Sequence, residues 1–384
     1  MDGEKQERVL VAMSGGVDSS VAALLLRDAG YDATGVTMKL FDNEVAGAGG
    51  ACVVGESTCC SQSDVEDARQ VAFGLGLEHF TFNFTGTFGC EVIDRFCDAY
   101  LHGRTPNPCI DCNRYLKFAA LQRRRAQLGF DYVATGHYAR RAFNERTGRF
   151  ELRCGLDEAK DQSYVLYHLT QDDLAHMLFP VGELTKPQVR ELAEKHSFGN
   201  AHKAESQDIC FVPDGDYASF IARYMGFGGD AARSDGKERA VPAAFEPGDI
   251  VDVGGKVLGR HAGLVHYTIG QRKGIGVAAP EPLYVVGKDA GKNVLVVGPR
   301  SELGVREVRA GDVNLISVAE LDRPMRVTAK THYRQRAQAA EAVVEGGQLV
   351  VRFDEAVARP AAGQSLVIYD GDAVVGGGTI GVSE

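Results

Sequence analysis

The stretch VLVAMSGGVDSSVAALLL, residues 9–26, constrains the fold more than any other part of the chain. A short apolar run leads into two glycines and then into a second apolar run with helical spacing, which predicts a strand, a tight turn and a helix. Further along, strands are expected at 33–40, 79–84 and 131–135, and helices near 63–75, 88–102 and 113–128. This alternation predicts a parallel sheet with helices on both faces, a Rossmann-like doubly wound α/β fold.

After about residue 225 the pattern changes to short β-type runs between glycine turns, such as QSLVIYDGDAVVGGGTI. Runs at this spacing predict one or two small β-barrels or sandwiches. We therefore expect a catalytic α/β domain at 1–215, a small central β domain at 216–286 and a C-terminal β-barrel at 287–384. No apolar run in the sequence is long enough to span a bilayer, and the polar start MDGEKQERVL is unlike a signal peptide. A cytoplasmic protein is expected.

The glycine turn has the layout of a phosphate-binding loop but lacks the lysine of one. A P-loop has the form G-x-x-x-x-G-K-[ST], in which the lysine reaches the terminal phosphates, whereas residues 12–19 are AMSGGVDS. Gly15 and Gly16 let the backbone approach an anion, and the helix start points amides at it. Asp18 would be repelled by phosphate unless it helps to hold Mg²⁺. The pattern favours an enzyme that adenylates its substrate with ATP and releases pyrophosphate. The alternative is a turn that needs glycine only for its backbone angles.

Two loops present cysteines in contexts that suggest chemistry. Cys109 and Cys112 lie in GRTPNPCIDCNRYLKF, residues 103–118, and Cys210 lies in ESQDICFVP. Two prolines stiffen the first loop, which we expect to hold its cysteines beside a helix that starts near Asn113. A thiol beside a helix start and nearby cations is expected to be more reactive than an ordinary cysteine.

Three roles remain open for these three thiols. They could simply pack in the interior. They could bind zinc or an iron–sulfur cluster with one open position. They could also carry out sulfur chemistry, in which one cysteine holds a persulfide and another attacks it and closes a disulfide. The contexts of Cys52, Cys90, Cys97 and Cys154 favour simple burial, and no role follows for Cys59 and Cys60.

Charge is distributed unevenly along the chain, whose formal net charge is −10. Residues 104–160 hold 12 Lys/Arg against 6 Asp/Glu, a net of +6 that surrounds the proline–cysteine loop. Such a stripe can make phosphate contacts to a nucleic acid, or it can be an ordinary solvated helix face.

The motif SGGVDSS resembles the PP-loop of the N-type ATP pyrophosphatase superfamily. Further motifs follow in order: GVTMK, GRTPNPC-x-x-CN, ATGHYAR, KDQSYVL, ESQDICF and HYTIGQRKGIG. Together, up to the C-terminal GQSLVIYDGD, they resemble the tRNA-specific 2-thiouridylase family over nearly the whole chain.

The resemblance implies an ATP-dependent tRNA-uridine 2-sulfurtransferase that thiolates the wobble uridine (U34) of tRNA. ATP would adenylate the C2 oxygen and release pyrophosphate. A persulfide on Cys210 would then supply sulfur, AMP would leave, and Cys112, as the nucleophile, would close a Cys112–Cys210 disulfide. The implied cofactors are ATP and Mg²⁺, with an iron–sulfur cluster as an alternative. The implied partners are the tRNA anticodon stem-loop and a sulfur-donor protein, such as a cysteine desulfurase or a relay protein, and no membrane.

The resemblance also implies the remaining site residues. The expected ATP site comprises Ala12, Met13, Ser14, Gly15, Gly16, Val17, Asp18, Ser19, Met38 and Gly136, with Asp18 also catalytic. Asn107, Pro108 and Cys109 would contact the target base. Contacts to tRNA would come from His137, Lys160, Asp161, Gln162, His332, Tyr333 and Gln364. Two positions depart from the family pattern, since many members have aspartate in place of Cys109 and arginine is more usual in place of His332.

Two other functions are compatible with parts of the pattern. A PP-loop ligase or amidotransferase acting on a small molecule would need the glycine turn but neither Cys112 nor Cys210. A non-catalytic tRNA-binding protein would bind a nucleotide only to stabilise one conformation.

Overall fold

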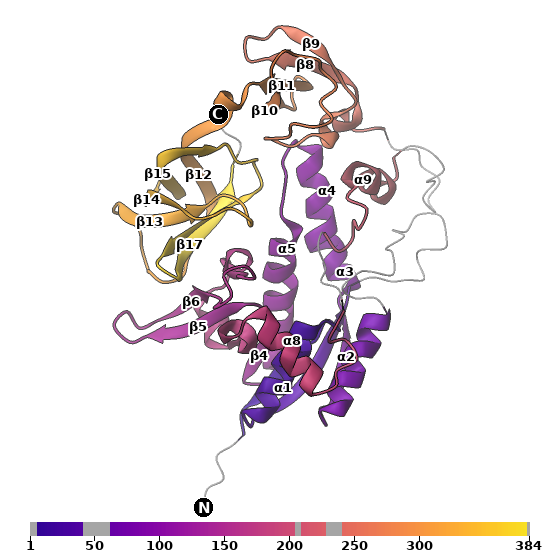
Figure 1. The fold of residues 1–384 in the computed structure, drawn as a ribbon, viewed down its shortest axis with the longest axis vertical. Helices are drawn as coiled ribbons and strands as arrows, with labels where there is room; N and C mark the ends of the chain where they lie inside the picture. Colours follow the sequence, from indigo (N-terminus) through magenta and orange to yellow (C-terminus); the bar gives the residue numbers. More distant parts are fainter. Residues whose placement is uncertain (1–5, 41–61, 204–208, 228–239, 382–384) are drawn as a thin grey trace, which may run out of the picture.

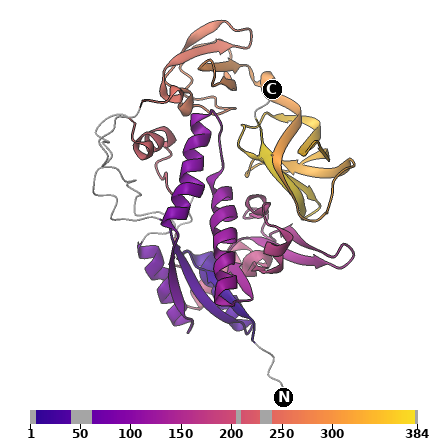
Figure 2. The ribbon, with the colours of Figure 1, turned by 180° about the vertical axis from the view of Figure 1, so that it is seen from behind.

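The structure is a computed structural model that describes residues 6–40, 62–203, 209–227 and 240–381. Figure 1 shows three parts: an α/β unit that contains the N-terminal strands, a small β module at the top, and a β-barrel beside both. Long helical segments that include α4 and α5 run from the α/β unit toward the β modules, and Figure 2 shows them from behind.

Five parallel strands form the sheet of the α/β unit in the order β3-β2-β1-β4-β7. In the central strand, Val9, Leu10 and Val11 are fully buried, as expected for a strand covered on both faces. Leu10 packs in one apolar cluster, and Val9 and Val11 pack in another. The predicted Rossmann-like fold is confirmed. The strands are β1 (Arg8–Ala12), β2 (Asp32–Lys39), β3 (His79–Asn83), β4 (Tyr132–Thr135) and β7 (Met177–Leu178).

The predicted helices are present as well. The first two are α1 (Val17–Asp28) and α2 (Gln62–Gly74). The next is a helical run of α3 (Thr85–Phe88), a π-helical turn (Gly89–Ile93) and α4 (Asp94–Leu101). A second run consists of α5 (Pro108–Asp111), a π-helical stretch (Cys112–Ala120) and α6 (Leu121–Leu128). The remaining helices are α7 (Gln171–Ala175), α8 (Lys186–Lys195) and α9 (Tyr217–Met225).

The helix expected to start near Asn113 begins earlier, at Pro108. The Asn107 side chain caps it by accepting a hydrogen bond from the Cys109 amide at 3.1 Å, and proline occupies the first helical position. Asparagine before proline is a strong helix start, because the side chain satisfies a free amide and proline needs no acceptor there. Cys109 and Cys112 therefore lie within the helical run and not in a loop before it.

The C-terminal half contains two separate β modules. The first is a sheet in the order β10-β11-β8-β9, made of β8 (Gly248–Asp252), β9 (Val257–His261), β10 (Tyr284–Asp289) and β11 (Val294–Gly298). Strands β12 and β17 also pair directly and so close the second sheet into a barrel. Its strands are β12 (Gly304–Leu315), β13 (Met325–Lys330), β14 (Gln338–Glu345), β15 (Gln348–Ala358), β16 (Ser365–Asp370) and β17 (Ala373–Ile380).

The expected boundary between the two β modules, 286/287, cuts through β10. Because β10 and β11 pair with each other and β11 pairs with β8, residues 284–298 belong to the central module. The structural break between the modules therefore falls after Gly298.

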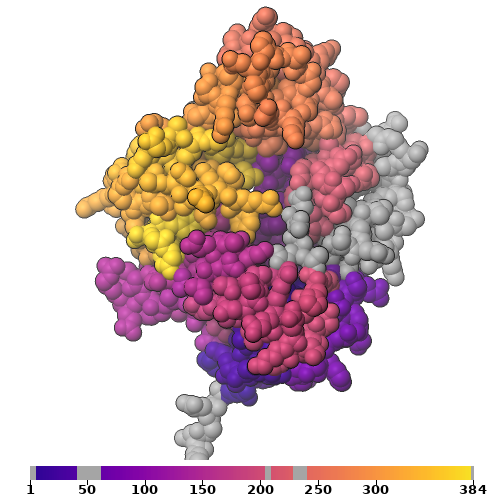
Figure 3. Space-filling model, in the orientation of Figure 1, coloured from indigo at the N-terminus to yellow at the C-terminus, as the bar shows by residue number. Residues whose placement is uncertain are grey.

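A hairpin from the N-terminal half joins the barrel sheet. Strands β5 (Ala139–Asn144) and β6 (Arg149–Cys154) pair with each other, and β6 pairs with β17 through Arg153 and Ala373. Figure 3 shows the barrel, in yellow and orange, lying against this region. The barrel is thereby joined to the segment that follows the carboxyl end of β4. Within the described residues, no helix combines the length and apolarity needed to cross a membrane.

Candidate active site

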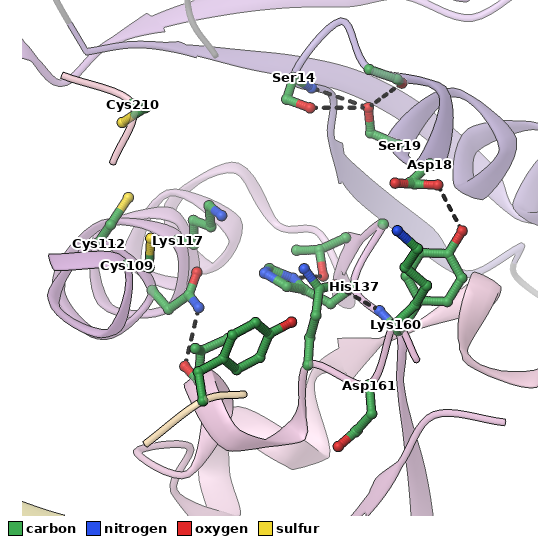
Figure 4. A pocket seen from close by; sticks show the side chains of 18 of the residues that line it. Ser14, Asp18, Ser19, Cys109, Cys112, Lys117, His137, Lys160, Asp161 and Cys210 are labelled. Carbon is green, nitrogen blue, oxygen red and sulfur yellow. Dashed lines mark hydrogen bonds between the residues drawn. The ribbon is translucent and has the colours of Figure 1, made fainter. Parts of the chain in front are cut away.

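A large cavity of about 2110 Å³ lies beyond the carboxyl ends of β1, β2 and β4, the usual place for a ligand in a parallel α/β sheet. Figure 4 shows it from close by. The barrel also contributes to its wall through Lys330 and Tyr333. Expected site residues that line it are Ala12, Met13, Ser14, Gly16, Val17, Asp18, Ser19, Met38, Pro108, Cys109, Cys112, Gly136, His137, Lys160, Asp161, Gln162, Cys210 and Tyr333. Gly15, Asn107, His332 and Gln364 are not part of the lining.

We call the part of the cavity formed by residues 12–19, 135–138 and Lys186 the phosphate end. There the Ser14 amide donates to Ser19 Oγ at 3.2 Å, and Ser19 Oγ donates to the Gly16 carbonyl at 3.0 Å. No side chain caps α1 at Gly16. The helix start is therefore shaped to accept an anion with its backbone amides.

Two glycines are required at the phosphate end by close approach. Gly15 has a φ of +74°, and a Cβ there would lie 2.3 Å from the Asp64 carbonyl oxygen. A Cβ on Gly136 would lie 2.6 Å from the Ser19 amide nitrogen. Any larger residue at position 136 would push the end of β4 away from α1.

The phosphate end contains a lysine, although its loop does not. Lys186 Nζ lies 2.7 and 2.8 Å from the two carboxylate oxygens of Asp18, and the Tyr138 hydroxyl donates to Asp18 Oδ1 at 2.7 Å. Lys186 is 6% exposed and begins α8. Lys186 was not predicted from the sequence as a site residue. A lysine in the first turn of a helix is unfavourable, because its charge opposes the helix dipole. The lysine at the helix start in LTKP was therefore a sequence signal that could have indicated a functional role for Lys186.

A second set of contacts supports the glycine turn from behind. Asn200 Nδ2 donates to the Gly15 carbonyl and to Ser20 Oγ, both at 2.9 Å. Lys203 Nζ lies 2.5 Å from carboxylate oxygens of both Asp64 and Asp67. Burial works to lower the pKa of Lys203, but its hydrogen bonds to these carboxylates raise it overall. Lys203 lies seven positions before Cys210. Its contacts with Asp64 and Asp67 therefore hold the start of the segment that leads to Cys210 beside the glycine turn.

We call the region around Cys109, Cys112 and Cys210 the thiol end. Cys109 is exposed, whereas Cys112 and Cys210 are half-buried. Cys112 and Cys210 pack against the same apolar cluster, which includes Phe88, Phe96 and Phe211. Figure 4 shows Cys109 and Cys112 on one helix, with their sulfur atoms directed to the side where Cys210 lies. The structure brings together thiols that are about 100 residues apart in the sequence.

Asp111 lies between the two helical cysteines and is half-buried. Burial raises the pKa of its carboxyl to about 6, although the guanidinium groups of Arg95 and Arg114 act in the opposite direction. Those arginines are engaged elsewhere, Arg95 with Glu91 and Arg114 with Asp312 of the barrel strand β12.

His137 is a buried histidine of the phosphate end. Its Nδ1 lies 2.7 Å from the Thr135 hydroxyl, and it is 8% exposed. Burial, followed by the nearby charge of Lys117, lowers the pKa of His137 well below its ordinary value.

In the described part of the chain, no three His, Cys, Asp or Glu side chains are grouped so that they could hold a metal ion. Cys109, Cys112 and Cys210 therefore do not form a ligand set for zinc or an iron–sulfur cluster in this conformation.

Known protein families match nearly the whole chain. Three family models match: "tRNA methyl transferase HUP domain" at residues 7–214, "tRNA methyl transferase PRC-barrel domain" at 239–299, and "Aminomethyltransferase beta-barrel domain" at 305–380. The chain is 47% identical over 380 residues to "tRNA-specific 2-thiouridylase MnmA 1" of Thermoanaerobacter sp. (strain X514), which covers 98% of each chain. The chain belongs to the tRNA-specific 2-thiouridylase family.

Other members of the 2-thiouridylase family are similarly related. MnmA of Clostridioides difficile (strain 630) is 44% identical over 375 residues, covering 97% of this chain and 98% of the relative. Among solved structures, a 4-thiouridine synthetase–RNA complex with bound ATP is 18% identical, covers 54% of this chain and 45% of the other, and has a TM-score of 0.35. A likeness this loose supports no conclusion about function.

Several residues that the family resemblance assigns to tRNA contact have structural partners in this chain. Asp161 accepts hydrogen bonds from the Gly155 and Ser163 amides at 3.1 and 3.0 Å. Gln162 Oε1 accepts from the Tyr138 amide at 2.9 Å. These two side chains fix the loop that presents Lys160.

The other expected tRNA residues come from the barrel. Gln364 Nε2 donates to the Thr105 carbonyl at 2.7 Å and so joins the barrel to the proline–cysteine segment. Tyr333 is 37% exposed, and its ring lies 6.0 Å from that of Tyr164. His332 is exposed beside it.

Proposed function

We propose that this chain is a tRNA-uridine 2-sulfurtransferase that uses ATP to replace the C2 oxygen of the wobble uridine with sulfur. The observation that carries the proposal is one cavity with a phosphate-binding turn at one end and Cys112 and Cys210 at the other. Family membership over the full length supports it independently.

The first step takes place at the phosphate end. An anticodon-loop uridine can leave its stack at low cost and enter a pocket. Its C2 oxygen attacks the α-phosphorus of ATP, the bond to the β-phosphate breaks, and pyrophosphate leaves. The glycine turn and the start of α1 hold the phosphates. Lys186 supplies the cation that the loop lacks, and Asp18 holds that cation in place.

Magnesium would accompany ATP in this scheme. Asp18 already carries Lys186 on both oxygens, so a magnesium ion would take most of its ligands from phosphate oxygens and water, as is usual for this metal. Bound there, it would neutralise charge on the leaving pyrophosphate.

The second step takes place at the thiol end. The terminal sulfur of a Cys210 persulfide attacks the activated C2, and the bond from C2 to the adenylate oxygen breaks, which releases AMP. Cys112 as a thiolate then attacks Cys210 Sγ and forms a Cys112–Cys210 disulfide. The electron pair of the broken sulfur–sulfur bond stays on the transferred sulfur, which becomes the thiocarbonyl. The apolar wall of Phe88 and Phe211 keeps water from the activated base.

Substrate binding is assigned to surfaces around the cavity. We assign Pro108 and Cys109 to the target base, and Lys160, His137, His332 and Tyr333 to the anticodon stem-loop. Asn107 and Gln364 are assigned supporting roles, because their side chains hold the helix start and the barrel contact. The persulfide sulfur would come from a separate donor protein such as a cysteine desulfurase or a relay protein.

The main alternative is a PP-loop ligase acting on a small substrate, which would need no thiol. The position of two half-buried cysteines in the same cavity as the phosphate turn favours sulfur transfer over ligation. The methyl transfer named in the matching family models would likewise give neither Cys112 nor Cys210 a chemical role.

A paired assay tests the proposal. Wild-type protein, given ATP, unmodified tRNA and a persulfide source, should release pyrophosphate only when tRNA is present and should form 2-thiouridine. Cys210→Ser should retain tRNA-dependent pyrophosphate release and lose thiolation. Cys90→Ser, an exposed cysteine outside the cavity, is the matched control and should retain both. The proposal would be excluded if Cys210→Ser thiolated tRNA at the wild-type rate, or if pyrophosphate were released at the same rate with and without tRNA.

A further inference from the structure

The thiol end contains a third cavity cysteine, Cys109, for which the two-thiol scheme has no chemical use. It lies on the same helical run as Cys112, three residues before it, and both side chains line the cavity. Residues three apart on a helix share a face. Figure 4 shows the two sulfur atoms directed to the same side.

We propose that Cys109 resolves the Cys112–Cys210 disulfide and so returns Cys210 to the thiol state after each turnover. This inference rests on the proposed function. The Cys109 thiolate attacks Cys112 Sγ, a Cys109–Cys112 disulfide forms, and Cys210 leaves as a thiolate. This exchange involves no net oxidation or reduction. An external dithiol then reduces the Cys109–Cys112 pair, with two electrons and two protons passing from the dithiol to the two cysteines.

Exposure is the first argument for this route. Cys112 and Cys210 are half-buried against an aromatic cluster, so a disulfide between them would be shielded from a reductant. Thiol–disulfide exchange requires access to the attacked sulfur. Cys109 is exposed, and exchange onto Cys109 moves the oxidised pair to a position that a reductant can reach.

Geometry is the second argument. Helix positions three apart have Cβ atoms about 5–6 Å apart, and a disulfide needs roughly 3.5–4.5 Å. Closing the pair therefore requires the first helical turn to tighten by about 1–2 Å, by comparison of these two ranges. The regular α-helical hydrogen bonding of this run ends at Asp111, and a π-helical stretch begins at Cys112. This change of hydrogen bonding falls between Asp111 and Cys112, within the turn that must tighten.

The remaining described cysteines do not fit the same role. Cys154 also lines the cavity, but burial raises the pKa of its thiol to about 11, which keeps it protonated and poorly nucleophilic. Cys90 and Cys97 do not line the cavity. Among the described cysteines, Cys109 therefore combines exposure with a place beside Cys112.

Peptide mapping after turnover tests the proposal, because Cys109 and Cys112 fall in one tryptic peptide, TPNPCIDCNR, residues 105–114. Wild-type, Cys109→Ser and Cys90→Ser proteins are loaded with persulfide by a cysteine desulfurase and allowed one turnover without reductant. They are then quenched with an alkylating agent. Wild type and Cys90→Ser should yield the 105–114 peptide with an internal disulfide. Cys109→Ser should yield that peptide cross-linked to the peptide that contains Cys210.

Rates provide the second readout. With limiting dithiothreitol, Cys109→Ser should lose about ten-fold in multiple-turnover thiolation, since an accessible exchange partner is missing, and the loss should shrink as the dithiothreitol concentration is raised. A wild-type protein that accumulates only the Cys112–Cys210 link would overturn the proposal. So would a Cys109→Ser loss of the same size at high dithiothreitol, because Cys109 would then act only through its contact with the base. If wild type itself forms no thiouridine in the single turnover, the proposed function fails instead.

Discussion

The two ends of the cavity are built in opposite ways. At the phosphate end, polar and charged side chains are paired with one another, as in the contacts of Lys186 and Tyr138 with Asp18. At the thiol end, Cys112 and Cys210 lie against aromatic rings. The first environment suits the stabilisation of charge on a phosphate, and the second suits the exclusion of water. In the proposed mechanism, activation and sulfur delivery are separate tasks joined by one bound base, so each end should be separable by mutation.

The largest effect is expected from Lys186→Met at the phosphate end. Loss of the cation that faces the phosphates should reduce tRNA-dependent pyrophosphate release and thiolation together by about 100- to 1,000-fold, as for the loss of one preorganised charge-stabilising group. Both rates are measured at saturating ATP and tRNA. Lys195→Met, an exposed lysine at the other end of α8, is the matched control.

Stability must be followed in the same experiment. Removing one partner of a buried ion pair can cost about 3–5 kcal/mol of folding free energy, so melting curves should accompany the rates. A folded Lys186→Met protein that releases pyrophosphate at the wild-type rate would show that this lysine does not act on ATP.

An intermediate effect is expected from Lys203→Met, which addresses the link between the two ends. Lys203 pairs with Asp64 and Asp67 of α2 and lies at the start of the segment that leads to Cys210. Its loss should reduce thiolation by about ten-fold while pyrophosphate release stays within about three-fold. The reason is that displacing the Cys210 thiol slows its reaction more than weakening a contact behind the glycine turn slows adenylation. Equal loss of both activities would mean that Lys203 serves only the glycine turn.

The smallest effect is expected from Asp111→Asn, and it concerns stability. The folded-state pKa of about 6 lies above the ordinary aspartate value of 3.8, so the protonated carboxyl favours the folded state. That contribution is complete below pH 3.8 and is lost as the pH rises through about 6. At pH 8, Asp111→Asn should therefore be more stable than wild type by about 1–3 kcal/mol, and the gain should fade toward pH 4.

Urea unfolding at pH 8 and near pH 4 checks this prediction. Glu145→Gln, a change at an exposed turn carboxyl, should leave the stability difference near zero at both values. A gain for Asp111→Asn that is the same at both pH values would refute burial of a charged carboxylate as its cause.

The sequence was informative wherever the signal was local. The strand β1, the glycine turn and the helix after it were predicted from this one stretch, and the structure contains all three. The start of the cysteine helix was missed because its prolines were interpreted as loop stiffeners, whereas Asn107 and Pro108 form a helix cap.

Features that depend on distant segments could not be predicted. Lys186 and Asn200 reach the glycine turn only after α8 folds back onto α1. The hairpin β5–β6 joins the barrel through a pairing of Arg153 with Ala373, and no periodicity in either segment specifies such a partner. The family resemblance assigned residues to tRNA contact, but it did not indicate that Asp161 and Gln162 use their side chains inside the protein.

The most direct test of the central claim follows the oxygen atom that leaves C2. An anticodon stem-loop with ¹⁸O at C2 of the wobble uridine is thiolated in one turnover, and the AMP is examined by mass spectrometry. If ATP activates the C2 oxygen in this cavity, the label will be found in the phosphate of AMP. AMP without the label, formed together with 2-thiouridine, would contradict the account.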